Sequence, residues 1–148
     1  MFFPAPRIQR KAHLNNVRIL LADDHRNFLM AVETLLGPTC QVIGSMPDGR
    51  SLFEAAMRLK PDVIVTDISM PVLSGIEAVN RLNESGCKSK IIFLTVHSDS
   101  DFVRTCLATG AFGYVVKSRI TTDLIPAIQD ALAGRIFISP PLAHENNV

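Results

Sequence analysis

The sequence has no marked excess of charge of either sign. Lysine and arginine together number 15, aspartate and glutamate number 14, and the formal net charge is +1 at pH 7. Proteins that bind nucleic acid or an anionic membrane mainly by electrostatics carry a concentrated positive charge. We therefore expect neither a nucleic acid nor a membrane as a partner of this chain.

Long hydrophobic runs and paired cysteines are missing as well. No apolar run approaches the roughly 20 residues that span a bilayer, and the opening residues 1–4 are too short for the core of a signal peptide. Cys40, Cys87 and Cys106 are widely spaced, with no C-x-x-C pair and no nearby histidine that would complete a zinc site. We expect a cytoplasmic protein whose thiols are buried, and neither a secreted nor a membrane-bound one.

What is present is the composition of one globular domain. Hydrophobic residues make up 47% and charged residues 20% of the 148 residues, which is typical of a chain that buries a single core. Residues 1–16 contain two prolines and three basic groups without a periodic apolar pattern, so we predict a flexible N-terminal extension there. We expect the folded domain over residues 17–138 and a C-terminal tail or truncated linker over residues 139–148.

Five short apolar runs recur along the predicted domain. They are continuous rather than alternating, which is typical of strands buried on both faces of a parallel sheet. The runs are Val17–Ala22, Cys40–Ser45, Val63–Thr66, Ile91–Thr95 and Phe112–Val116. The second run is the most polar, so we predict that it lies at an edge of the sheet.

Apolar residues at helical spacing follow each run. These amphipathic stretches cover residues 28–36, 52–59, 76–82, 102–107 and 124–132. The first ends at Gly37-Pro38 and the last at Gly134, and Pro126 fits the last helix only near its first turn. Strict alternation of strand and helix predicts an α/β fold, with a parallel sheet between helices and a ligand site beyond the carboxyl ends of its strands.

Polar residues stand where four of the five predicted strands end. Asp23 and Asp24 follow the first strand, Asp67 the third, and Thr95 and Lys117 the fourth and fifth. Three gathered carboxylates suit Mg²⁺, which prefers oxygen ligands and commonly binds substrate phosphate as well. A lysine and a hydroxyl group would then stabilise phosphoryl oxygens, and a carboxylate can itself be the nucleophile. These residues indicate a metal-and-phosphate site, but they leave open which carboxylate attacks.

Four sequence segments resemble the receiver domains of two-component response regulators. They are Leu20–His25 (LLADDH), Val63–Pro71 (VIVTDISMP) with Gly75, Phe93–Thr95 (FLT) and Gly113–Lys117 (GYVVK). The resemblance implies a flavodoxin-like (βα)5 doubly wound fold, with a five-stranded parallel sheet in the order 2-1-3-4-5.

The resemblance assigns the acidic residues to phosphoacceptor and metal roles. Asp67 would be the phosphoacceptor, and Mg²⁺ would be held by Asp23, Asp24, Asp67 and the backbone carbonyl of Ser69. Asp23 and Asp24 could otherwise be residues of a turn or a helix cap.

Three further residues have roles implied by the resemblance. Lys117 would bind the phosphoryl group, and Thr95 and Tyr114 would form a conformational switch pair, although Tyr114 could simply be a core aromatic. His25 is a weaker metal-ligand candidate because imidazole suits softer metals. His97 could set the rate of dephosphorylation.

The NarL-type subfamily is the most similar, as shown by residues 22–25, the Lys117-Ser118 junction and residues 133–140. This type normally continues into a helix-turn-helix domain, whereas the chain ends at Val148. Many receivers have a proline after the lysine, often behind a cis bond; because Ser118 stands there, we predict no cis peptide.

The implied function is phosphorylation-dependent signalling rather than enzymatic turnover. A sensor histidine kinase would donate a phosphoryl group to Asp67, and the domain would then signal to a second copy or a downstream target by changing its conformation. One alternative is a Mg²⁺-dependent phosphohydrolase with an aspartate nucleophile, although such enzymes usually carry an aspartate where Ser69 stands. The other is the receiver part of a longer DNA-binding transcriptional regulator.

Overall fold

The computed structural model describes residues 14–96 and 100–140, and the statements below refer to those residues. Most of the predicted N-terminal extension and of the predicted C-terminal tail lies outside this part, as do His13, His97 and His144. The interpretation of His97 therefore stays a prediction.

Strands and helices alternate along the described chain. The strands are β1 (Arg18–Ala22), β2 (Gln41–Met46), β3 (Val63–Asp67), β4 (Lys90–Thr95), β5 (Gly113–Val116) and β6 (Phe137–Ile138). The α-helices are α2 (Arg26–Leu36), α3 (Gly49–Leu59), α4 (Gly75–Glu84), α5 (Ser100–Ala108) and α6 (Ile120–Leu132), and a short 3-10 helix, η1 (Lys117–Arg119), joins β5 to α6. The first five strands begin and end within one residue of the predicted runs.

The strands form one parallel sheet in the order β2-β1-β3-β4-β5-β6. This order confirms the flavodoxin-like fold and the edge position of the polar second strand. The sixth strand was not predicted, because two residues are too few to show a period in the sequence. It extends the sheet beyond β5, through the pairs Gly113 with Phe137 and Tyr114 with Ile138.

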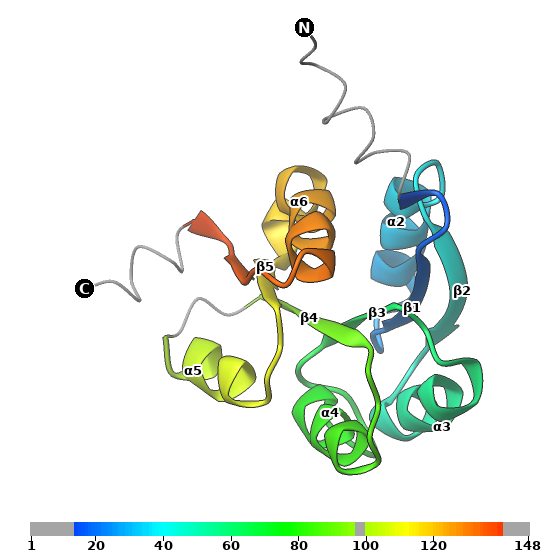
Figure 1. Cartoon of the computed structure of the whole chain (residues 1–148), viewed down its shortest axis with the longest axis vertical. Coiled ribbons are helices and arrows are strands. Elements are labelled where there is room, and N and C mark those ends of the chain that lie inside the picture. The colour runs from blue at the N-terminus through cyan, green and yellow to red at the C-terminus, as the bar shows by residue number, and fades with distance from the viewer. Residues whose placement is uncertain (1–13, 97–99, 141–148) are drawn as a thin grey trace, which may run out of the picture.

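Helices cover both faces of the sheet and create two separate cores. Helices α2 and α6 lie on one side, and α3, α4 and α5 lie on the other (Figure 1). Successive strand residues face opposite ways, so Leu20 packs into the core beneath α3 to α5, while Ile19 and Leu21 pack into the core beneath α2 and α6. Burial on both faces explains why the strands are continuous apolar runs.

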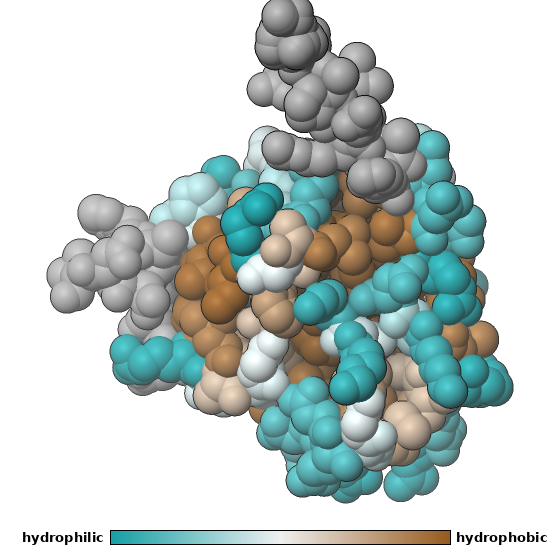
Figure 2. All heavy atoms as spheres, viewed as in Figure 1, coloured by the Kyte–Doolittle hydropathy of each residue, from teal (hydrophilic) through white to brown (hydrophobic). Residues whose placement is uncertain are grey.

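Hydrophobic and hydrophilic residues are unevenly distributed over the surface. Figure 2 shows hydrophobic residues around α6 and the β6 end of the sheet, and mostly hydrophilic residues over α4. Exposed Ile136, which immediately precedes β6, is part of the hydrophobic surface at that edge. No helix in residues 14–96 and 100–140 is both long enough and apolar enough to cross a bilayer.

The packed part of the chain extends beyond both predicted boundaries. Leu14 is 1% exposed and lies in the core beneath α2 and α6, and its carbonyl accepts a hydrogen bond from the Val17 amide at 3.0 Å. Ser139 is 0% exposed. Two buried residues therefore lie in the ranges that the sequence assigned to the extension and the tail.

Pro126 corrects one detail of the prediction. It is the seventh residue of α6, well inside the helix rather than in its first turn. The helix starts at Ile120, earlier than the apolar stripe from Leu124 indicated. Because proline has no amide hydrogen, the carbonyl of Thr122 loses its helical partner. Thr122 is exposed, so water can hydrate that carbonyl.

Candidate functional site

Asp23 and Asp24 lie directly beyond the carboxyl end of β1. The Asp23 amide donates to the carbonyl of Met46 at the end of β2 (3.0 Å), and Asp23 Oδ1 accepts from the amide of His25 (2.8 Å). Asp23 is buried and Asp24 is exposed. Because the strand ends at Ala22, the two residues are not forced to opposite faces of the sheet, and both carboxylates reach the same site.

Asp67 is the last residue of β3, in the middle of the sheet. It is 7% exposed, and its Oδ1 accepts a hydrogen bond from the Ile68 amide at 2.8 Å. The hydroxyl group of Thr66 donates to the Asp67 carbonyl at 3.0 Å. These bonds fix the main chain and one carboxylate oxygen, and they leave Oδ2 to face the other charged residues.

Gly75 allows the first turn of α4 to lie against Asp67. The Gly75 amide donates to the carbonyl of Ile68 at 2.7 Å, and a Cβ atom at position 75 would lie 1.9 Å from the Asp67 carbonyl oxygen. Only glycine permits this approach without movement of the backbone. The glycine of the sequence motif is therefore explained by packing against the predicted phosphoacceptor.

The acidic residues converge as the sequence predicted. One ligand atom from each of Asp23, Asp24, His25 and Asp67 lies within 4.8 Å of the others. Carboxylate oxygens are the donors that hard divalent cations prefer, and like charges this close repel one another unless a cation is bound. The geometry and the donor atoms fit a divalent cation at the carboxyl edge of β1 and β3.

Lys117 completes the charged site from the end of β5. Its Nζ lies 2.6 Å from Asp23 Oδ2 and 3.4 Å from Asp67 Oδ2, and its side chain is 11% exposed. With Asp23, Asp24 and Asp67 ionised, the single lysine leaves two negative charges, which matches the charge of one divalent cation.

The ionisation of Asp67 reflects this crowded environment. Burial raises the pKa of the Asp67 carboxyl above its ordinary value of 3.8; the Lys117 charge opposes this rise, and the Asp23 charge adds to it. The hydrogen bond from the Ile68 amide also lowers the pKa, but the net direction is upward. A bound cation would favour the ionised carboxylate that nucleophilic attack requires.

His25 lies beside the acidic residues but points largely into solvent. Its Nδ1 is 3.1 Å from Asp23 Oδ1 and 3.3 Å from Asp24 Oδ1, and its side chain is 70% exposed. Its backbone amide has the clearer role, because it fixes the Asp23 carboxylate.

Ser69 lies in the exposed loop between β3 and α4, two residues beyond Asp67. This loop makes a tight turn in which the Leu73 amide donates to the Pro71 carbonyl at 2.7 Å, with Val72 at φ +70°. A positive φ is unusual for a β-branched residue, so the loop beside the acidic site holds local strain.

Thr95 and Tyr114 lie on neighbouring strands and are buried, at 1% and 0% exposure. Tyr114 pairs with Phe93, two residues before Thr95, and both Phe93 and Tyr114 pack into the core beneath α3 to α5. Strand alternation places Thr95 on that same face of the sheet. The two residues of the predicted switch pair are therefore near neighbours.

The sequence did not reveal two groups of residues around Lys117. One is the Phe28 ring, whose centroid lies 4.6 Å from the Lys117 Nζ atom, a cation–π contact that restrains the lysine. The other is a hydrogen-bonded network of Arg119, Asp123 and Ser139 behind the lysine. The sequence pattern placed Phe28 only in the apolar face of a predicted helix. The contact between Asp123 and Ser139 could not be predicted, because no sequence pattern links these two residues.

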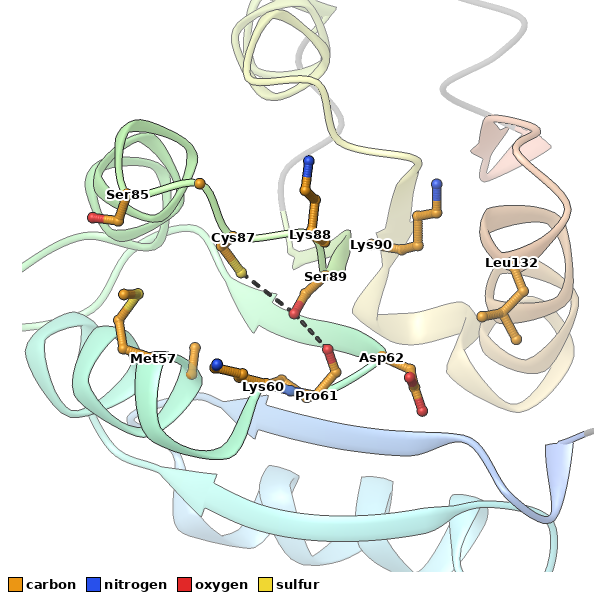
Figure 3. A pocket seen from close by; sticks show the side chains of 12 residues that line it. Met57, Lys60, Pro61, Asp62, Ser85, Cys87, Lys88, Ser89, Lys90 and Leu132 are labelled. Atoms are coloured by element: carbon orange, nitrogen blue, oxygen red, sulfur yellow. Dashed lines mark hydrogen bonds between the residues drawn. The ribbon is translucent and has the colours of Figure 1, made fainter.

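Two cavities differ in their relation to this site. One of about 280 Å³ is lined by Asp23, Asp24, Arg26 and Glu33 among others, so it adjoins the acidic residues. A larger one of about 590 Å³ lies at the opposite end of the sheet, where Ser89 accepts from Cys87 and donates to the carbonyl of Pro61 (Figure 3).

The larger cavity lacks the chemistry of the acidic site. It contains three lysines, and in Figure 3 Lys88 and Lys90 point away from Asp62. The Lys90 Nζ atom lies over the Phe112 ring at 4.3 Å, and Lys60 caps the carboxyl end of α3. A lysine at a helix carboxyl end offsets the helix dipole and a lysine over an aromatic ring makes a cation–π contact, so the presence of Lys60 and Lys90 needs no ligand. The acidic edge remains the candidate site.

Comparison with known proteins agrees with this geometry. The family described as "Response regulator receiver domain" matches residues 19–129. The chain is 33% identical over 132 residues to the transcriptional regulatory protein DegU of Brevibacillus brevis, covering 88% of this chain and 56% of that protein. It is 34% identical over 126 residues to the nitrate/nitrite response regulator protein NarL of Escherichia coli strain K12, covering 84% of this chain and 58% of that protein.

Solved structures show the same similarity. A LuxR-family two-component response regulator from Aurantimonas has a TM-score of 0.85 at 31% identity, covering 89% of this chain and 96% of that one. The signal receiver domain of the putative response regulator NarL from Mycobacterium tuberculosis has a TM-score of 0.77 at 26% identity, covering 82% and 99%. The chain spans between 56% and 64% of the length of the first curated relatives it matches.

Proposed function

The chain belongs to the family of response regulator receiver domains, and from this premise we propose that it accepts a phosphoryl group on Asp67, with Mg²⁺ bound beside it. The observation that carries this proposal is the meeting of three carboxylates with Lys117 at the carboxyl edge of the sheet. Among them, Asp67 is the one that belongs to a strand, as the last residue of β3. Its Oδ2 oxygen lies 3.4 Å from Lys117 Nζ, and Asp23 Oδ2 lies 2.6 Å from the same atom.

The Asp67 geometry suggests how the transfer proceeds. The Ile68 amide holds Oδ1, so Oδ2 is the oxygen that attacks phosphorus. A new O–P bond forms as the P–N bond of a phosphohistidine, or the P–O bond of a small acyl phosphate, breaks, and the bonding electron pair leaves with the donor. Lys117 and the Thr95 hydroxyl group stabilise the oxygens of the transferred group.

The metal would be held by Asp23, Asp24, Asp67 and the backbone carbonyl of Ser69. The carboxylates offer the hard oxygen donors that Mg²⁺ requires. When bound, Mg²⁺ would neutralise charge on the phosphoryl oxygens and on the crowded carboxylates. Asp23 is already oriented for this role by the amide of His25.

The biological role follows from the chemistry of the site. A sensor histidine kinase is the proposed donor, and the domain later hydrolyses its own acyl phosphate, so its chemistry is self-modification rather than turnover of a substrate. The signal would pass to a second copy or a downstream target through a change of conformation. The need for a kinase donor and the free thiols of Cys40, Cys87 and Cys106 support a cytoplasmic location.

The phosphoacceptor is tested with acetyl phosphate and Mg²⁺. We expect intact-mass spectrometry to find one added phosphoryl group on the parent protein and none on Asp67→Asn, because the amide cannot attack phosphorus. Asp62→Asn is the matched control, since this exposed aspartate lies at the opposite end of the sheet, and it should label fully. Full labelling of Asp67→Asn, or continuous hydrolysis of a phosphate ester, would contradict the proposal.

The metal site is tested by titration calorimetry with Mg²⁺. Replacing Asp23 and Asp24 together with Ala leaves a divalent cation with one carboxylate, so Mg²⁺ affinity should fall by at least about tenfold. Asp62→Asn again serves as the control. Unchanged affinity in the double variant would place the metal elsewhere.

A further inference from the structure

Asp123 is a buried carboxylate whose oxygens accept four hydrogen bonds. Arg119 donates through Nε at 2.8 Å and Nη2 at 3.3 Å, the Thr122 hydroxyl at 3.1 Å and the Ser139 hydroxyl at 2.8 Å. Burial alone would raise the pKa of Asp123, but the hydrogen bonds from Arg119, Ser139 and Thr122 together lower it. The carboxylate is therefore a fixed, ionised anchor near the start of α6.

Ser139 joins this anchor to the end of β5. It is fully buried; its amide donates to the carbonyl of Tyr114 at 3.0 Å, and its hydroxyl oxygen accepts from the amide of Val116 at 3.0 Å. The same hydroxyl donates to Asp123 Oδ2. Ser139 therefore holds the last residues of β5 by both its backbone and its side chain, and transfers that restraint to α6.

Lys117 follows directly on the strand end that Ser139 holds. The residue before it, Val116, is bonded to Ser139, and Arg119, two residues after it, is bonded to Asp123. Ser118 lies between Lys117 and Arg119 and is exposed. A proline at this position would restrict the backbone, whereas serine does not. The turn that carries Lys117 is thus bonded on both sides to one network, in which Asp123 and Ser139 are buried and the Arg119 side chain is 38% exposed.

We propose that Ser139 and Asp123 are positioning residues for Lys117, so that the segment after α6 is part of the phosphorylation machinery. This inference rests on the proposed function of Lys117. The Nζ atom must lie between Asp23 Oδ2 and Asp67 Oδ2, at 2.6 and 3.4 Å, at the end of a long flexible side chain. A small change in the backbone of residues 116–119 would displace it from the point where the phosphoryl oxygens arrive.

The test compares Ser139→Ala with Thr122→Val. Both variants remove one hydroxyl donor to Asp123, but only Ser139 is also bonded to Val116 at the strand end; the exposed Thr122 hydroxyl is shared between Asp123 Oδ1 and the Arg119 carbonyl. We expect Ser139→Ala to slow phosphorylation by acetyl phosphate and Mg²⁺ by about 10- to 100-fold, and Thr122→Val to leave the rate near that of the parent. In protein with isotope-labelled lysine, the Cε and Nζ resonances of Lys117 should shift in Ser139→Ala only.

Two outcomes would overturn the inference. One is a parent-like rate in folded Ser139→Ala, and the other is a slowed rate with unchanged Lys117 resonances. If Ser139→Ala does not fold, Asp123→Asn takes its place. Asp130→Asn on the same helix is then the control, because the Asp130 carboxylate bonds only to exposed Arg135 among the side-chain bonds described. If the parent itself accepts no phosphoryl group, the proposed function fails, and the Lys117 resonances still decide whether Ser139 positions the lysine.

Discussion

Asp123 makes the stability of the fold depend on pH in a defined direction. Its pKa in the folded protein is lower than the ordinary value of 3.8. Between those two values the unfolded chain binds more protons, so the stabilisation from Asp123 is fully present above pH 3.8 and is lost as the pH falls through the folded value. The hydrogen bonds to this carboxylate are therefore an acid-sensitive part of the structure.

We predict that Asp123→Asn lowers the free energy of unfolding by about 2 kcal/mol at neutral pH, because a charged acceptor of several hydrogen bonds is lost. The deficit relative to the parent should be smaller in acid, below pH 3.8, than at neutral pH, because the parent carboxyl is increasingly protonated as the pH falls. Urea unfolding at both pH values measures it. Asp130→Asn, in an exposed pair, should cost less than about 1 kcal/mol. A deficit of equal size at both pH values would show that Asp123 acts by shape rather than by charge.

At the scale of single residues, the sequence predicted which charged residues meet at the candidate site better than it predicted what surrounds them. Asp23, Asp24, Asp67 and Lys117 could be placed together because parallel strands end at one edge of the sheet. The partners of Lys117 could not. Phe28 and Ser139 act through tertiary contacts with residues far away in the sequence, and single-residue chemistry gives no sign of such contacts.

At the scale of elements, the approach of α4 to β3 fixes the geometry around Asp67. Helix α4 begins at Gly75, directly after the N-cap residue Ser74, which forms a capping box with Glu77. The Ser74 hydroxyl oxygen accepts a hydrogen bond from the Glu77 amide at 3.1 Å, and the Glu77 carboxylate accepts one from the Ser74 amide at 3.4 Å. The cap positions the helix start, and the missing side chain at residue 75 lets it touch the Asp67 carbonyl. Local capping and close packing thus act on the same residue.

Gly75→Ala should destabilise the protein by about 2 to 3 kcal/mol, because the new methyl group overlaps backbone atoms that cannot move freely. It should also slow phosphorylation, since the carbonyl that it displaces belongs to Asp67. Urea unfolding and acetyl phosphate labelling measure the two effects. Gly37→Ala is the control: φ at Gly37 is −51°, which alanine adopts readily, and a methyl group there would lie 3.1 Å from the Glu33 carbonyl oxygen, a tight contact rather than an overlap. Its stability should therefore stay within about 1 kcal/mol of the parent. Equal stability of both variants would contradict the close approach.

Most strands could be predicted from the sequence, whereas β6 and the start of α6 could not. The first five strands were found because burial on both faces leaves continuous apolar runs. Strand β6 was missed since its two residues form a strand only through pairing with β5. The start of α6 was placed too late because Ile120 to Asp123 carry no apolar stripe. Asp123 stabilises that first turn instead, through a local bond from Arg119 and a tertiary bond from Ser139.

At the scale of the whole molecule, the proposed signal is a shift between two conformations. A phosphoryl oxygen on Asp67 would attract the Thr95 hydroxyl, and the space that Thr95 leaves would admit a new position of Tyr114. The surface formed by α5, β5 and α6 would change with it. Phosphorylation can shift such an equilibrium only by the difference between the interaction free energies of the phosphoryl group in the two conformations. Loss of one hydroxyl contact that forms in the signalling conformation should therefore reduce that difference by about 1 to 3 kcal/mol.

Thr95→Ala should therefore accept phosphate but pass on little of the signal. We expect hydrogen exchange in α5 and α6 to change on phosphorylation of the parent and to change much less in the variant. Thr109→Ala is a matched control, because the Thr109 hydroxyl bonds only to the Cys106 carbonyl at the end of α5 among the contacts described. A response in Thr95→Ala as large as that of the parent would remove Thr95 from the pathway.

The central claim is that Asp67 is the residue that carries the phosphoryl group, and chemical trapping of the modified side chain tests it most directly. An aspartyl phosphate is reduced by borohydride to homoserine, which peptide sequencing by tandem mass spectrometry assigns to one position. After treatment with acetyl phosphate and Mg²⁺, the account predicts homoserine at position 67 and unmodified aspartate at positions 23 and 24. Homoserine at position 23 or 24, or phosphate found on a serine, threonine or histidine with none at Asp67, would contradict it.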